Sequence, residues 1–175
     1  MIPAKDPSWG KLFQSYEHSA FRLAVRDSYN VPVEREPLRR WLHDGVVDQR
    51  WQACWFGQLA AQRREGKRFH RVRVVSTPLS PYSRWGIALA ERANAEGDDI
   101  RYLDRAAAGT LPAYDYWLFD SRLVARMHFA EDDTFIGFDL IEDPAAVVQH
   151  NYWRDEAVHA STTSEEFASE HAPRH

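Results

Sequence analysis

The residues best suited to acid–base or anion-binding chemistry lie in one aromatic segment, Leu111 to Phe129, which reads LPAYDYWLFDSRLVARMHF. Asp115 and Asp120 could act as general acid and base, with Arg126 holding an anion beside them. Arginines from neighbouring segments could complete such a site or bind a small ligand in a cleft. The candidate residues for this ligand site are Tyr82, Arg84, Trp85, Arg101, Asp115, Trp117, Asp120 and Arg126. The competing interpretation is the middle of a β-sheet, which accounts for every apolar residue of the segment.

The strongest run of positive charge lies in residues 63–73, RREGKRFHRVR. It could bind the phosphates of a nucleic acid or another anion, through Arg64, Lys67, Arg68 and Arg71. The structural interpretation is that residues 63–68 span a helix end, where cations suit the helix dipole. Arg71 and Arg73 would share one face of a strand, where carboxylates could pair with them. A net charge of −4 for the chain also argues against a dedicated nucleic-acid binder.

Motifs with a defined chemistry are missing from the sequence. There is no phosphate-binding P-loop, no dinucleotide-binding glycine motif, no G-x-S-x-G elbow, no H-E-x-x-H and no C-x-x-C. The eight histidines do not cluster at metal-ligand spacing. We therefore expect neither a metal nor a cofactor.

The composition is that of a globular domain, with 44% hydrophobic and 13% aromatic residues among 175. The single cysteine, Cys54, excludes an internal disulfide framework and suits a reducing cytoplasm. The N-terminus carries no secretory signal, and no apolar run is long enough to cross a membrane. A cytoplasmic protein is expected.

The elements that must position these residues follow from hydrophobic periodicity and capping signals. Helices are predicted in 8–20, 37–45, 48–66, 80–97 and 144–159, and strands in 21–29, 69–76, 99–105, 114–119, 122–129 and 134–143. Residues 69–104 form a β-α-β unit, and Asp120-Ser121 is the turn of a hairpin. In that hairpin Asp115 could meet Arg126 or His128 across the strands.

The predicted fold class is therefore α/β, or α+β, with a mixed sheet of about five to six strands and flanking helices. It contains the β-α-β unit followed by a hairpin that continues as a meander. A single domain is expected over residues 1–161, with an N-terminal part at 8–66 and the β-α-β-β-β-α part at 67–161. The polar residues 162–175 are expected to form a flexible tail.

Three segments carry a resemblance to a known family: SAFRLAVRDSYNVPVEREPLRRWL, RVRVVSTPLSPYSRWGIALAERANAEGDDIRYLDR and DYWLFDSRLVARMHF. They resemble an actinobacterial domain family of unknown function, over about residues 13–160. Members of that family are often encoded beside helix-turn-helix regulators of the Xre type. The resemblance implies a cytoplasmic protein with such a regulator as partner, and it implies no reaction.

The predicted topology is also similar to one half of a phospholipase-D-like fold. Active members carry H-x-K-x-x-x-x-D on the first hairpin strand, where the His attacks phosphorus and the Lys neutralises phosphate charge. When the motif is aligned on Asp120, Ala113 stands at the His position and Asp115 at the Lys position. The resemblance thus implies a degenerate copy that lacks the nucleophile and has an anion in place of the cation.

The sequence leaves three hypotheses for function. The first is a non-enzymatic regulatory or interaction protein that acts with a helix-turn-helix regulator or binds a small ligand, and that could form a homo-oligomer. The second is a hydrolase-like enzyme with an atypical site built from Asp115, Asp120 and arginines. The third is a weak nucleic-acid binder that uses residues 63–73.

Overall fold

The structure is a computed structural model, and it describes residues 1–171 of the chain. Its helices are α1 (Pro7–Ser15), α2 (Arg35–Asp44), α3 (Ala53–Arg64), α4 (Pro81–Glu96), α5 (Pro144–Ala160) and α6 (Ser164–His171). Its strands are β1 (Ile2–Pro3), β2 (Ser19–Ala24), β3 (Arg68–Val75), β4 (Asp98–Asp104), β5 (Tyr116–Phe119), β6 (Leu123–Phe129), β7 (Phe135–Ile141) and β8 (Thr162–Thr163). Within the described residues, no helix combines the length and the apolar character needed to cross a membrane.

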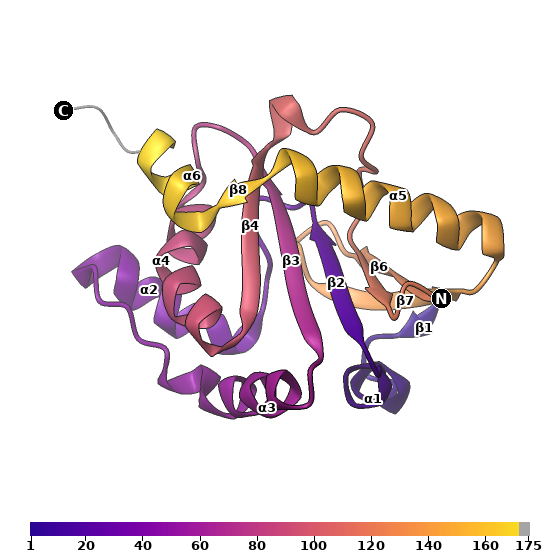
Figure 1. Cartoon of the computed structure of the whole chain (residues 1–175). Helices are drawn as coiled ribbons and strands as arrows, with labels where there is room; N and C mark the ends of the chain where they lie inside the picture. Colours follow the sequence, from indigo (N-terminus) through magenta and orange to yellow (C-terminus); the bar gives the residue numbers. More distant parts are fainter. Residues whose placement is uncertain (172–175) are drawn as a thin grey trace.

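The strands form one mixed sheet in the order β1-β7-β6-β5-β2-β3-β4-β8 (Figure 1). Strands β2, β3 and β4 run parallel, and every other neighbouring pair is antiparallel. The expected mixed sheet is confirmed, but the expected number of five to six strands is wrong, because the sheet has eight. The two additional strands, β1 and β8, lie at the edges and have two residues each. A period-2 pattern cannot be recognised in two residues.

The β-α-β unit is present as β3, α4 and β4. Ser80 caps α4 by accepting a hydrogen bond from the backbone N–H of Ser83, and Pro81 occupies the first turn. Gly97 ends the helix with a φ of 113°, in the left-handed region that favours glycine. These local signals place β3 and β4 in parallel as neighbours.

The aromatic segment forms the hairpin β5–β6, which turns at Asp120 and Ser121 with φ values of 51° and 56°. Tyr116 and Leu118 pack on one face of the sheet, while Trp117 and Phe119 pack on the other. Both faces of β5 are buried. The interpretation of this segment as the middle of a sheet is therefore confirmed for β5.

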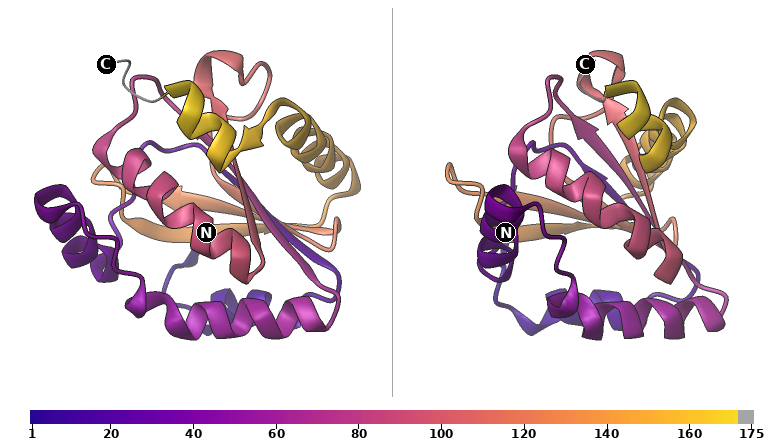
Figure 2. Two further views of the ribbon diagram at one scale, coloured as in Figure 1. Left: turned by 60° about the vertical axis from the view of Figure 1, so that its left-hand side comes forward. Right: turned by 90° about the vertical axis from the view of Figure 1, so that its left-hand side faces the viewer.

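Helices cover both faces of the sheet (Figures 1 and 2). Helix α5 packs alone on one face, through Val147 and Ala157. Helices α1, α3, α4 and α6 pack on the opposite face, where the larger apolar core lies. Helix α2 lies outside α4 and covers a small cluster around Trp85. The multi-helix face contains a pocket whose lining includes residues of α1, α3 and α4.

The flexible tail expected at residues 162–175 is wrong for 162–171. Strand β8 pairs with β4, and α6 packs Phe167 against the Tyr102 ring with 5.5 Å between ring centroids. The side chain of Phe167 is only 2% exposed. One buried aromatic residue anchors a segment that is otherwise polar, and for this reason its polar composition wrongly predicted a flexible tail. Residues 172–175 lie outside the described residues.

Candidate functional site

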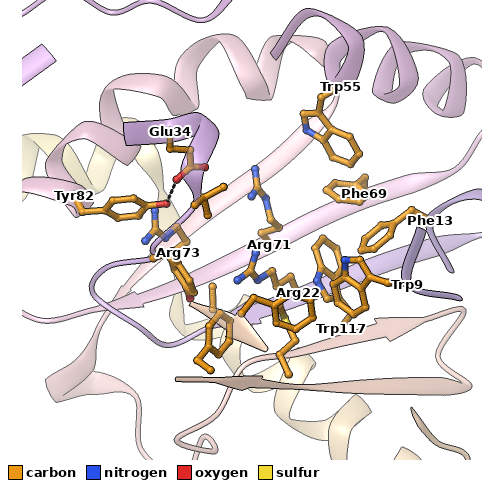
Figure 3. Close-up of a pocket in the computed structure, with 16 residues that line it drawn as sticks. Trp9, Phe13, Arg22, Glu34, Trp55, Phe69, Arg71, Arg73, Tyr82 and Trp117 are labelled. Atoms are coloured by element: carbon orange, nitrogen blue, oxygen red, sulfur yellow. Dashed lines mark hydrogen bonds between the residues drawn. The ribbon is translucent and has the colours of Figure 1, made fainter. Parts of the chain in front are cut away.

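A pocket of about 350 Å³ opens on the sheet face that α1, α3 and α4 cover (Figure 3). Aromatic side chains gather at one side of it, and a glutamate and arginines lie toward the other (Figure 3). The lining residues are Trp9, Phe13, Arg22, Ala24, Tyr29, Val31, Glu34, Trp55, Phe69, Arg71, Arg73, Tyr82, Trp117, Met127, Phe129 and Phe135. The pocket is thus amphipathic, with a mostly apolar lining and a cationic floor.

The cationic floor consists of Arg22, Arg71 and Arg73. Arg22 of β2 is the direct ladder partner of Arg71 of β3, and Arg73 follows two residues later on the same face. Like charges directly opposite each other on a sheet face are destabilising. Three arginines at the centre of a sheet therefore need compensation from other groups.

Asp115 compensates Arg22. Its Oδ2 accepts hydrogen bonds from Nη2 of Arg22 at 2.9 Å and from the Tyr29 hydroxyl at 2.6 Å, and its Oδ1 accepts one from the backbone N–H of Val25 at 2.9 Å. The Asp115 side chain is fully buried. Three donors of the protein itself thus occupy the buried Asp115 carboxylate.

Asp98 compensates Arg71. The carboxylate lies at the start of β4 and accepts hydrogen bonds from both Nε and Nη2 of Arg71. Such a bidentate contact is the strongest pairing that an arginine makes with a carboxylate. Burial raises the pKa of Asp98, and the charge of Arg71 opposes that rise.

Arg73 has no carboxylate within ion-pairing distance among residues 1–171. Its side chain is buried, and its Nη2 has no hydrogen-bond partner in that part of the chain. The guanidinium lies 5.6 Å from the ring centroid of Tyr29 and 5.3 Å from that of Tyr82. A Cβ atom at Gly86 would lie 2.6 Å from Nη1 of Arg73, so this glycine leaves the space that the guanidinium fills. Arg73 is the cation that the protein buries without a direct counter-ion.

Glu34 lies at the same end of the pocket. Its carboxylate accepts a hydrogen bond of 2.6 Å from the Tyr82 hydroxyl, drawn as a dashed line in Figure 3. Burial raises the pKa of Glu34, and the positive charges of Arg73, Arg22 and Arg71 oppose the rise. The carboxylate is therefore directed to Tyr82 and makes no ion pair with Arg73 among the described residues.

The opposite end of the pocket is built from aromatic rings of separate elements. Phe13 of α1 meets Trp117 of β5 edge-to-face at 4.9 Å, and Phe69 of β3 lies 5.1 Å from the same Trp117. Trp55 of α3 packs edge-to-face on Phe69 at 5.0 Å, and Trp9 lies nearby (Figure 3). Such rings offer a surface for an apolar or aromatic group.

The structure brings only some of the candidate ligand-site residues together. Tyr82 and Trp117 line the pocket, and Asp115 lies beneath it, bound to Arg22. Trp85 packs with Tyr82 in the small cluster under α2, and Arg84 is exposed on α4.

Arg101 and Arg126 belong to the other sheet face. Arg101 donates hydrogen bonds to Ser161, and Arg126 lies 4.2 Å above the Tyr114 ring. The expected cross-strand meeting of Asp115 with Arg126 or His128 is wrong. The reason is that Asp115 precedes β5 and turns toward β2, on the face opposite to that of Arg126.

Asp120 performs a structural role in the hairpin turn. Its carboxylate accepts hydrogen bonds from the backbone N–H groups of Glu17, His18 and Ser19, at 2.7 to 3.0 Å. These backbone hydrogen bonds lower the pKa of Asp120 against the effect of burial. Asp120 thus anchors the chain where α1 leads into β2, away from the pocket lining.

The basic run at 63–73 is dispersed in space. Arg68 pairs with Asp99, Lys67 pairs with Glu65, and Arg71 points into the pocket. Arg64 is exposed at the end of α3. The expected pairing of strand residues with carboxylates holds for Arg71 but not for Arg73.

Sequence reasoning missed Arg22, Tyr29, Glu34 and Arg73 as site residues. The available signal was an arginine within each of two otherwise apolar strand segments, FRLA and VRVV. No group of three or more His, Cys, Asp or Glu residues in the described part of the chain is arranged to bind a metal ion.

Residues 7–169 match the family described as Domain of unknown function (DUF6879). The chain belongs to the DUF6879 family. No curated protein matches it.

Among solved structures, the DUF6879 chain is similar to NucT from Helicobacter pylori, with a TM-score of 0.52 and 8% sequence identity. The match covers 89% of this chain and 90% of that chain. At this identity the likeness concerns the fold alone. NucT has a phospholipase-D-like fold, which agrees with the topological resemblance of the sequence. The expected actinobacterial source and Xre-type neighbour stay predictions.

Proposed function

We propose that this DUF6879 protein is a non-enzymatic binding protein that takes up a small anionic ligand with an apolar or aromatic body. The observation that carries the proposal is Arg73, a buried guanidinium in an aromatic pocket without a direct counter-ion among the described residues. Burying an uncompensated charge costs several kcal/mol. A bound anion would remove that cost, and the aromatic end would bury the rest of the ligand.

The hydrolase alternative receives less support from the same geometry. Its candidate acid–base groups, Asp115 and Asp120, are held by an ion pair and by backbone hydrogen bonds, respectively. Ala113 stands where the phospholipase-D-like motif would need a nucleophile. The nucleic-acid alternative is weakened because Lys67, Arg68 and Arg71 are each paired with a carboxylate.

Isothermal titration calorimetry with 2-naphthoate tests the proposal, with the neutral 2-naphthamide as a matched probe. We expect saturable 1:1 binding of the carboxylate and binding at least about tenfold weaker for the amide, since charge-assisted hydrogen bonds contribute more than neutral ones. Arg73→Met is expected to remove the preference for the anion. Arg64→Met, the same exchange at an exposed site, is the control and should leave both affinities unchanged.

Equal affinity for 2-naphthoate in the wild-type protein and in Arg73→Met, or no saturable binding of either probe, contradicts the proposal. We further propose that the protein acts on a helix-turn-helix regulator in response to ligand binding. Co-purification of the two proteins with and without ligand tests this second proposal separately.

A further inference from the structure

The chemical class of the ligand can be narrowed from the charges of the pocket, given that the proposed function holds. Two of its three arginines have dedicated buried partners, Asp115 for Arg22 and Asp98 for Arg71. Three positive charges less two negative charges leave one cation, Arg73. An ionised Glu34 would cancel the remaining positive charge of Arg73. Burial raises the pKa of Glu34 and thereby favours its neutral form. The pocket thus offers at most one uncompensated positive charge.

The hydrogen-bond donors without a partner also favour a ligand with a single negative charge. Among the described residues, two of the pocket-lining arginines have a buried nitrogen without a partner, Nε of Arg22 and Nη2 of Arg73, which a ligand reaches only if the side chains shift. Both guanidinium groups lie against the ring of Tyr29, with their central carbons 4.9 Å and 5.6 Å from its centroid. A carboxylate has only two oxygens and needs fewer donors than a phosphate monoester. A phosphate monoester has three terminal oxygens and would bury at least one without a donor.

The shape of the pocket separates the two ends of the ligand. Phe13, Trp55, Phe69 and Trp117 gather at the side away from Glu34 and Tyr82, with Arg71 and Arg22 between the two sides (Figure 3). A ligand with a charged head and a planar apolar body would place its head at the arginines and its body between these rings. Charged groups along the body would be buried without partners.

We infer that the pocket selects an aromatic monocarboxylate and discriminates against phosphorylated ligands, including nucleotides. The second negative charge of a phosphate monoester would be desolvated without a counter-ion. The inference rests on the proposed function and adds charge selectivity to it.

The test compares 2-naphthoate with 2-naphthyl phosphate, which share the same aromatic body. Calorimetry at pH 7.5 is expected to give an affinity at least about tenfold higher for the carboxylate, because a buried unpaired charge costs several kcal/mol. The same pair is then measured at pH 5, where the phosphate carries a single negative charge because its second pKa is about 6. The ratio of the two affinities is expected to shrink toward one.

The shared aromatic body cancels in this ratio. Its change with pH therefore reports on the charges of the ligand and of the pocket, including Glu34 and the arginines, which act more strongly on the doubly charged probe. A second experiment uses Asp115→Asn, which releases Arg22 and is expected to shift the preference toward the phosphate. If this variant does not fold, the comparison at two pH values in the wild-type protein still decides.

The outcomes separate the two proposals. Absence of binding for both probes overturns the proposed function and the inference together. Equal or tighter binding of the phosphate at pH 7.5 overturns the inference and leaves the binding function standing. A preference for the carboxylate that stays unchanged at pH 5 also overturns the inference, because selection would then rest on shape.

Discussion

At the scale of single residues, the site contains three arginines, of which two are paired with a carboxylate among the described residues. Arg22 and Arg71 each have a buried carboxylate, whereas Arg73 lies among tyrosine side chains and has no carboxylate within ion-pairing distance in the described part of the chain. A cation–π contact contributes up to about 2 kcal/mol when desolvated, which is less than the cost of burying an ion. We propose that this difference between the arginines makes the pocket select an anion.

The pairing of Asp115 with Arg22 gives a prediction about stability. Asp115→Ala leaves Arg22 buried without its partner, and we expect a loss of about 3–5 kcal/mol in the free energy of unfolding. Asp115→Asn keeps the shape and some hydrogen bonds, so its loss is expected to be smaller. Urea denaturation followed by circular dichroism measures both, with the exposed Glu131→Gln as control. A loss below about 1 kcal/mol for Asp115→Ala would show that this ion pair is not structural.

Glu34 gives a prediction about pH. Because burial raises the pKa of Glu34 above its ordinary value of 4.5, the folded protein holds a proton that the unfolded chain has already released. The contribution of this group is fully present below pH 4.5 and is lost as the pH rises through the folded-state value. Glu34→Gln does not titrate, so its stability relative to the wild-type protein is expected to increase from pH 5 to pH 8.

Urea denaturation at pH 5, 6.5 and 8 measures that difference between Glu34→Gln and the wild-type protein. Glu36→Gln, an exposed neighbour on α2, is the matched control. A difference that is constant over this range would mean that Glu34 titrates normally in the folded state.

At the scale of elements, much of the fold could be predicted from local signals. Ser80, Pro81 and Gly97 define α4 by capping and backbone conformation, and the turn at Asp120-Ser121 defines the hairpin. The six longer strands follow from alternation of apolar residues. The two edge strands could not be predicted, because β1 and β8 exist only through pairing with β7 and β4.

The pocket could be predicted only in part. Trp117 and Tyr82 are aromatic residues on predicted elements, and Arg71 stands out in a basic run. The register that places Arg22 opposite Arg71 is a property of the assembled sheet. Glu34 and Tyr29 come from the irregular connection after β2, where no periodic pattern indicates which side chain turns inward.

The C-terminal segment gives a prediction for the element scale. Phe167→Ala removes a buried ring from the contact between α6 and β4, and we expect it to cost about 3–5 kcal/mol in stability. Glu170→Ala, on an exposed position of the same helix, is the control and should change stability by less than about 0.5 kcal/mol. Thermal and urea denaturation give both values. A neutral Phe167→Ala would mean that α6 contributes nothing to the fold, as a flexible tail would.

At the scale of the whole molecule, the sign of the charge differs between the chain and its pocket. The chain carries a net charge of −4, while the pocket holds an excess of arginines near its centre. Long-range attraction of polyanions is therefore expected to be weak, and the proposed anion binding would depend on entry into the pocket. This arrangement suits a small ligand better than a nucleic acid, whose many phosphates would approach a chain of net negative charge.

A buried cation that only a bound ligand neutralises lowers the stability of the ligand-free protein. Replacing Arg73 by methionine keeps an unbranched side chain of similar length and removes the buried charge. Exchanges of this kind stabilise proteins by about 1–4 kcal/mol when apolar packing is retained. We therefore expect Arg73→Met to raise the free energy of unfolding of the ligand-free protein by about 1–3 kcal/mol.

Urea denaturation without ligand and with saturating 2-naphthoate measures the free energy of unfolding in both states and so tests this expectation. The wild-type protein is expected to gain stability from the ligand, whereas Arg73→Met should be more stable alone and gain nothing. Arg64→Met should behave like the wild-type protein in both conditions. If Arg73→Met instead destabilises the ligand-free protein by more than about 1 kcal/mol, Arg73 serves the fold through its tyrosine contacts, and the buried charge is no longer a sign of a ligand.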